Sequence, residues 1–246
     1  MSLETSFQSA NECYFNGDAD QAQRLNAVIL KENPNYAPAL FLEAQMAQSN
    51  GLSAKKSIIL FSKAVENDPQ NQEYLATRAE LYLLADFDEV VAYGFDRDKK
   101  YLHKALEDAD KVIEIDILSV YGAQAYEIRS KAHVSLEQYE DAINDWEMCR
   151  CVSESHTNIA LSLIGQIKTE SMKDYEGALV AYDEFVAYNE NGGTYASDIS
   201  KAEAYYYRGK LKIEHLNQKE SGLSDLKIAS KPGTSDFYTE EYESYK

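Results

Sequence analysis

Apolar and small residues recur along much of the chain at the three- and four-residue spacing of an α-helix. The stretch 126–149 shows the pattern best: Tyr126 and Ser130 share one face of a first helix, and Ala142 and Trp146 share one face of a second. Side chains at this spacing meet on the same side of a helix. The stretch therefore predicts two short amphipathic helices joined by a tight turn, with the single tryptophan packed between them.

The same two-helix pattern recurs through most of the chain, each time with a small residue near the middle of the first helix. Three of the five intervals between successive small residues are about 34 residues long, a repeat period typical of stacked helix pairs. The two longer intervals require insertions, which we place at 85–100 and 189–200. The small residues are Ala10, Ala44, Ala79, Ser130, Gly165 and Gly209.

This unit resembles the tetratricopeptide repeat (TPR), whose pattern sets aromatic, small and alanine positions at fixed intervals. The resemblance implies an all-α fold, a right-handed α-solenoid of about six TPR-like helix-turn-helix repeats with an insertion in the third. The last residues, 232–246, form an acidic aromatic tail, expected either as a further short helix or as a mobile end. In the clearest copy the matching residues are Tyr126, Arg129, Ser130, His133, Ala142 and Trp146. The expected repeats are 3–36, 37–71, 72–118, 119–156, 157–191 and 201–231, in an array spanning 1–231.

In such an array the first helices of the repeats line a concave groove, and the resemblance implies a scaffold that binds a peptide or helix of a protein partner there. The first two repeats are the most ligand-like, because exposed aromatic rings stand beside Asn and Gln amides, which suits an extended peptide. The alternative is that Phe7 and Phe41 only pack between helices. The expected groove residues are Phe7, Asn11, Tyr14, Phe41, Gln45, Gln48, Glu80, Glu127, Lys131, Tyr206 and Lys210.

One use that the resemblance suggests, capture of a partner's C-terminal carboxylate by a clamp of Lys, Asn and Arg, is not expected here. Asn11 occupies one matching position, but Phe7 stands where the clamp needs a lysine. Arg78, Arg129 and Arg208 precede the small residues of their repeats without the partner Asn and Lys. We expect these three arginines to form structural ion pairs with acidic residues of adjacent helices.

Charge narrows the class of partner. The 246 residues carry a formal net charge of −18, which repels nucleic-acid phosphates and anionic membranes. The start MSLETSFQ has neither the basic nor the apolar part of a signal peptide, and no apolar run is long enough to cross a bilayer. Three cysteines do not make a disulfide framework, so the sequence predicts a reducing, cytoplasmic location.

No catalytic or metal-binding pattern stands out, and we expect neither an enzyme nor a bound cofactor or metal. Cys149, Cys151 and His156 form the one cluster of metal-like composition, but a structural zinc site needs a fourth ligand. Cys149 matches a helix-packing position, which predicts a buried thiol. Motifs for phosphate cradles, nucleophile elbows and zinc proteases are absent from the sequence.

The acidic insertion 85–100 is a second candidate surface. Its carboxylates lack the central glycine of a calcium-binding loop, so the plain interpretation is a lengthened helix pair with a solvated acidic bend. Long insertions in repeat arrays often carry specific contacts. The alternative function is therefore a structural or assembly module that forms homo-oligomers through the ends of the array or through this insertion.

Overall fold

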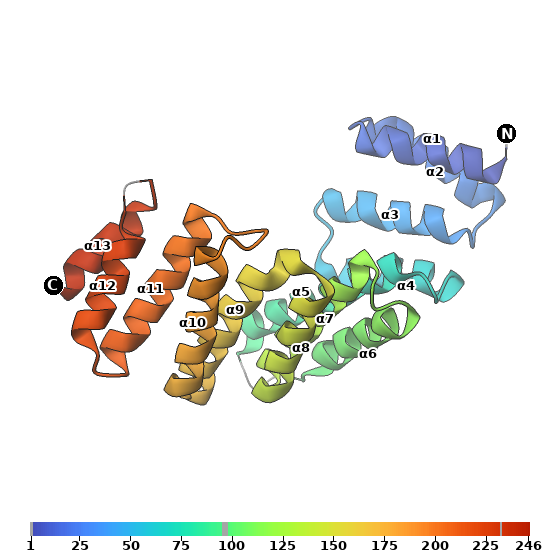
Figure 1. Cartoon of the computed structure of the whole chain (residues 1–246). Helices are drawn as coiled ribbons and strands as arrows, with labels where there is room; N and C mark the ends of the chain where they lie inside the picture. Colours follow the sequence, from blue (N-terminus) through green and yellow to red (C-terminus); the bar gives the residue numbers. More distant parts are fainter. Residues whose placement is uncertain (1, 95–97, 232) are drawn as a thin grey trace. The chain divides into compact units, whose positions relative to one another are not determined.

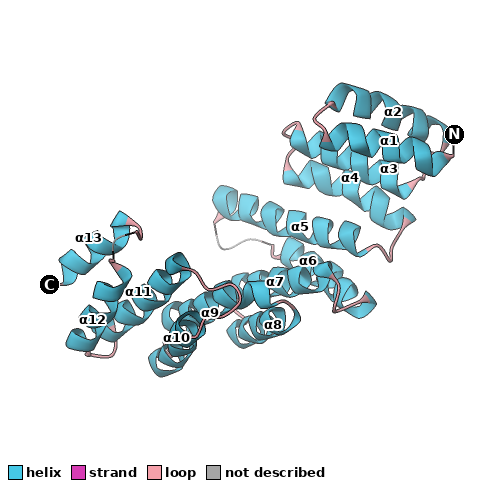
Figure 2. Cartoon of the chain, turned by 45° about the horizontal axis from the view of Figure 1, so that its top comes forward, coloured by secondary structure: helices cyan, strands magenta, loops and turns pink. Residues whose placement is uncertain are grey.

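The computed structural model describes residues 2–94, 98–231 and 233–246. The described residues form α-helices joined by short loops, with no strand among them, which confirms the all-α class (Figure 2). The chain divides into two compact units, Met1–Leu136 and Glu137–Lys246. Each unit has its own packing.

The first unit is a series of antiparallel helix pairs (Figure 1). Within it α1 packs on α2, α3 on α4, and α5 on α6, while α7 also packs on α5 and α6. Successive pairs therefore stack on their neighbours, as helical repeats do. The helices are α1 (Leu3–Phe15), α2 (Ala19–Glu32), α3 (Ala37–Ser49), α4 (Ala54–Asn67), α5 (Gln72–Tyr93), α6 (Lys100–Ile115) and α7 (Val120–Ser135).

Local sequence sets where these helices begin and turn. The side chain of Asp18 accepts a hydrogen bond from the backbone N–H of Gln21 at 3.1 Å, which caps the start of α2. The preceding residue, Gly17, has a φ of +83°, a conformation that glycine adopts without steric cost. The turn between α1 and α2 is therefore encoded by its own two residues.

The core of the first unit lies between the paired helices. The small residues Ala10, Ala44 and Ala79 are fully buried. Phe61 of α4, which has no exposed surface, belongs to the same core cluster as Ala44 and Ala79. The small positions thus allow the close approach of helices that the sequence pattern predicts. In α2 the buried Asn26 donates from Nδ2 to the carbonyl oxygen of Ala39.

The second unit begins with α8 and ends with a helix in the tail. Its helices α9 and α10 pack together, and so do α11 and α12. Helix α9 passes directly into a short π-helical turn, η2, which ends at Lys173 in a left-handed conformation. The elements are α8 (Tyr139–Val152), η1 (Glu154–His156), α9 (Thr157–Gln166), η2 (Ile167–Met172), α10 (Tyr175–Glu190), α11 (Asp198–Glu214), α12 (Lys219–Ala229) and α13 (Asp236–Tyr245).

Glycine is required where the helices of the second unit touch. A Cβ added to Gly165 would collide with the ring of Tyr182. A Cβ added to Gly209 would lie 2.8 Å from the carbonyl oxygen of Gly222 on the neighbouring helix. Gly165 and Gly209, two of the small residues singled out in the sequence, therefore stand where a ring or a backbone approaches too closely for a side chain.

The interpretation of 85–100 as a lengthened helix pair with a solvated acidic bend is corrected in one respect: the helix is lengthened, but two of its acidic side chains are buried. Helix α5 continues to Tyr93, and Asp86 and Glu89 on it are only 3% and 8% exposed. Glu89 accepts a charged hydrogen bond from Lys55 of α4 at 3.1 Å. The cation partner explains why the carboxylate of Glu89 faces the protein rather than water. The acidic Asp96 lies outside the described residues.

The C-terminal tail is a helix that packs on the preceding pair. Helix α13 contacts α12, and the rings of Phe237 and Tyr238 each lie 5.3 Å from the ring of Tyr206 on α11. The hydroxyl of Tyr206 donates to the carboxylate of Glu241 at 3.2 Å. Of the two alternatives for 232–246, the described part therefore adopts the docked helix.

Candidate functional site

Four of the predicted groove residues meet around one cavity in the first unit. Phe7 and Asn11 reach it from α1, and Phe41 and Gln45 reach it from α3. The cavity has a volume of about 220 Å³, and α5 closes it with Glu73 and Tyr74. Sequence reasoning placed these four side chains on one face, and the structure places them around one cavity.

Aromatic rings form the floor of this cavity. Phe41 stacks on Tyr74 with ring centroids 4.4 Å apart and meets Phe61 edge-on at 5.2 Å. Phe41 is only 6% exposed, so the expectation of an exposed ring is wrong there and the packing alternative holds. The reason is that α5 brings Tyr74 onto the same ring, a contact between distant segments that the pattern of α3 does not reveal. Phe7 is half-buried against Tyr36, with ring centroids 5.8 Å apart.

The rim of the cavity is polar and open. Asn11 and Gln45 are partly exposed, and no hydrogen bond joins either side-chain amide to another described residue. Phe15, at the end of α1, is 72% exposed although it lines the same cavity. Glu73 is exposed at the start of α5, and partial burial of its carboxyl raises its pKa above the usual value. Sequence reasoning missed Phe15 and Glu73, although Phe15 follows Tyr14 at the end of the same helix.

The other predicted residues of the first unit lie elsewhere or are already paired. The hydroxyl of Tyr14 shares a hydrogen bond of 2.8 Å with Ser49, and its ring lines a different cavity. Glu80 accepts a bond of 2.9 Å from the amide of Gln124. Lys131 pairs with Glu127 one turn away at 2.5 Å. Gln48 is exposed.

Tyr206 and Lys210 belong to the second unit and line a separate cavity of about 200 Å³. Tyr206 is buried, and burial together with the carboxylate of Glu241 raises the pKa of its hydroxyl. The ammonium of Lys210 lies 5.8 Å from the centroid of the Tyr206 ring. Helix α13 covers Tyr206, so this predicted groove residue contacts the chain's own C-terminal helix.

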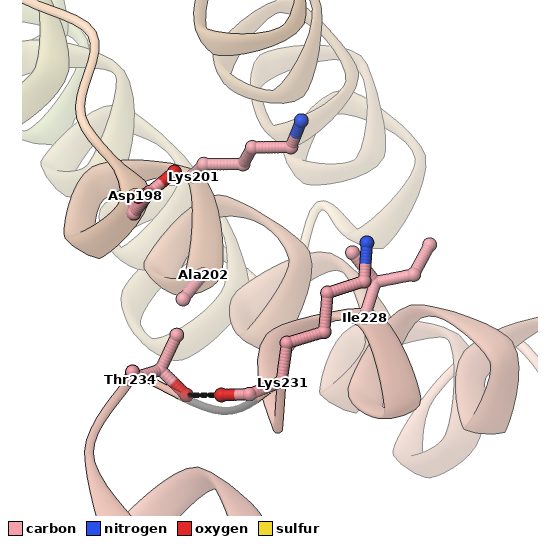
Figure 3. Close-up of a pocket in the computed structure, with 7 residues that line it drawn as sticks. Asp198, Lys201, Ala202, Ile228, Lys231 and Thr234 are labelled. Atoms are coloured by element: carbon pink, nitrogen blue, oxygen red, sulfur yellow. Dashed lines mark hydrogen bonds between the residues drawn. The ribbon is translucent and has the colours of Figure 1, made fainter.

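A further cavity, of about 200 Å³, lies beside the start of α11. Figure 3 shows Lys201 of α11 and Lys231, which follows α12, on its wall together with Asp198 and Thr234. Lys201 pairs with Glu190 at 2.8 Å and lowers the pKa of that carboxyl. The positive charge at this cavity is therefore partly neutralised.

The three arginines form ion pairs with neighbouring helices, as predicted. Arg78 holds Asp108 through two bonds of 2.7 and 2.8 Å, and Arg208 holds Asp225 through two bonds of 2.9 and 2.8 Å. Arg129 pairs with Asp110 at 2.8 Å. Each arginine is partly or mostly buried, so its role here is structural.

The described residues contain no group of three or more His, Cys, Asp or Glu side chains placed to hold a metal ion. Cys149 is fully buried, as its packing position predicts, whereas Cys151 is exposed. No helix among the described residues has the length and apolar character needed to cross a bilayer.

Helix pairs stacked through small residues define an α-helical-repeat protein. Comparison with known sequences and structures specifies the type of repeat. No family model matches the chain. Its sequence is 26% identical to a DnaJ homolog subfamily C member 7 homolog of Schizosaccharomyces pombe over 65% of this chain, and it spans 41% of that relative's length.

Solved structures give the fold. The chain is similar to PilF of Pseudomonas aeruginosa, with a TM-score of 0.61 and 16% identity over 99% of this chain and 97% of that one. It is similar to PilW, described as a type IV pilus biogenesis factor, with a TM-score of 0.63 and 14% identity over 97% and 98%. For YrrB, described as a TPR protein with an unusual peptide-binding site, the TM-score is 0.57 and the identity 16% over 89% and 97%. The chain therefore has the tetratricopeptide-repeat fold.

Proposed function

We propose that this chain is a protein-interaction scaffold, and that the first unit binds a peptide or helix of its partner at the cavity between α1, α3 and α5. The observation that carries the proposal is the pair of unbonded amides, Asn11 and Gln45, above an aromatic floor. Amide groups bind peptide backbone, and aromatic rings supply apolar contact area. The description of YrrB as a TPR protein with a peptide-binding site supports the same class of function.

The types of side chain on the wall of this cavity favour binding of a partner over catalysis. The cavity holds one carboxylate and no histidine, cysteine or lysine on its wall. A binding surface needs apolar area and hydrogen-bonding groups, and both are present. The second unit contributes Tyr206 and Lys210 as a further predicted surface, which requires that α13 leave its place.

The test is to change the rim and keep the floor. Phe15→Ala and the double variant Asn11→Ala with Gln45→Ala remove exposed groups, so both should leave the far-UV circular dichroism spectrum and melting temperature unchanged. Peptides selected by the full chain from a phage-displayed random library should bind these variants at least several-fold more weakly. Binding that survives all three substitutions would place the site elsewhere and overturn the proposal.

A further inference from the structure

The cavity between α1, α3 and α5 carries one charged side chain, Glu73, and its charge has no counterpart among the described residues. No ion pair or hydrogen bond joins the carboxylate of Glu73 to another described residue. The side chain is in the first turn of α5, next to Tyr74, which is buried and stacked on Phe41. Its carboxylate thus stands at the border between water and an apolar floor.

Partial burial has a cost for this carboxylate. Glu73 is exposed, but neighbouring protein removes part of the water around its carboxyl, which raises the pKa. A cation brought next to it on binding would restore the lost interaction. The empty partner position is therefore a feature that a ligand can use.

The other residues of the cavity wall determine which kind of ligand group binds beside the cation. The rings of Phe7 and Phe15 face the cavity, and its volume of about 220 Å³ has room for one large side chain. For scale, a protein cavity of roughly 150 Å³ holds a benzene molecule. An apolar anchor and a positive charge must then lie close together on the ligand.

We propose that the site in the first unit selects a basic peptide, in which an apolar side chain enters the cavity and an adjacent lysine or arginine pairs with Glu73. The inference rests on the proposed function and adds the chemistry of the partner. Asn11 and Gln45 bond the peptide backbone, and the net charge of −18 attracts a basic segment over longer range. Such a site selects a positive charge on the ligand, whereas a carboxylate clamp selects a negative one.

The experiment uses the full chain and the same phage-displayed random library. We expect enriched peptides to carry lysine or arginine next to a leucine, isoleucine, methionine or phenylalanine. Fluorescence anisotropy with one enriched peptide then compares the parent, Glu73→Gln and Glu114→Gln. Glu114 is an exposed carboxylate on α6 away from the cavity, so its substitution makes the same change in net charge.

Glu73→Gln should weaken binding about tenfold, which corresponds to roughly 1.4 kcal/mol, while Glu114→Gln should change it less than twofold. A charge exchange, Glu73→Lys against a peptide whose basic residue is replaced by glutamate, should recover most of the loss. If Phe15→Ala weakens binding but Glu73→Gln does not, the basic selectivity is wrong and the peptide site stands. If neither substitution matters, the proposed function itself fails.

Discussion

Replacing Phe41 by alanine measures how far this ring belongs to the core rather than to the binding surface. Phe41 is 6% exposed and contacts two rings, Tyr74 and Phe61. Burying a phenylalanine contributes about 1.5–3 kcal/mol, and each aromatic pair adds roughly 0.5–1.5 kcal/mol. We therefore expect Phe41→Ala to lower the free energy of unfolding by about 3–5 kcal/mol, the usual cost of this truncation in a core.

The matched control is Phe15→Ala, which removes the same side chain from the rim of the same cavity. Because Phe15 is 72% exposed, its loss should change stability by no more than about 0.5 kcal/mol. Urea unfolding followed by far-UV circular dichroism measures both variants. Urea slopes of about 1–3 kcal/mol per molar translate the loss at Phe41 into a midpoint lower by roughly 1–5 M.

The urea unfolding curves need a separate transition for each of the two compact units, because repeat arrays do not have to unfold in one step. Phe41→Ala should shift the unfolding transition of the first unit, which contains Phe41. An unchanged midpoint for Phe41→Ala would refute the assignment of this ring to the core. Equal losses for Phe41→Ala and Phe15→Ala would show that burial does not distinguish the two positions.

Three further outcomes follow from contacts in the structure. Gly165→Ala should lower stability by about 1–3 kcal/mol because the new Cβ collides with Tyr182; an unchanged melting temperature in circular dichroism would contradict this contact. Asp225→Ala leaves Arg208 and Lys212 without their buried partner and should cost about 3–5 kcal/mol in urea unfolding, so a loss below about 1 kcal/mol would mean that water replaces the carboxylate at no penalty. Partial burial raises the pKa of Glu73 in the folded state, so the folded protein binds the proton of this carboxyl more tightly than the unfolded chain does. The parent should therefore gain stability relative to Glu73→Gln as the pH falls from neutral through that pKa. Urea midpoints of both proteins at neutral and mildly acidic pH test the sign, and a relative loss of stability on acidification would be inconsistent with it.

Small-residue positions could be predicted from the sequence because the constraint behind them is local and steric. Gly209 faces Gly222 across a gap that admits no Cβ, and such a position shows as a glycine or alanine at a fixed helical register. Ion pairs of Arg78 and Arg208 were predictable for a similar reason, since an arginine beside a packing position needs a nearby acid.

Burial that depends on distant segments was not predictable. The ring of Phe41 is covered by Tyr74, and Glu89 is neutralised by Lys55, from a segment well before it in the chain. The pattern of a single helix does not record which side chain arrives from the next one. For the same reason the sequence indicated the face that carries Asn11 and Gln45 but not Glu73 as the charge at its rim.

The two forked bonds between arginine and aspartate bear on how the helices of a pair are aligned lengthwise. Apolar packing alone specifies the offset of two helices along their axes less strictly than a bidentate hydrogen-bonded pair does. The fork of Arg208 on Asp225 matches only one offset, because both bonds need their partner atoms within 3 Å. Arg78 and Asp108 impose the same condition on α5 and α6. These ion pairs fix the axial register of the two helices. Apolar replacements that keep the volume would leave stability nearly intact but would let the two helices pack at more than one offset.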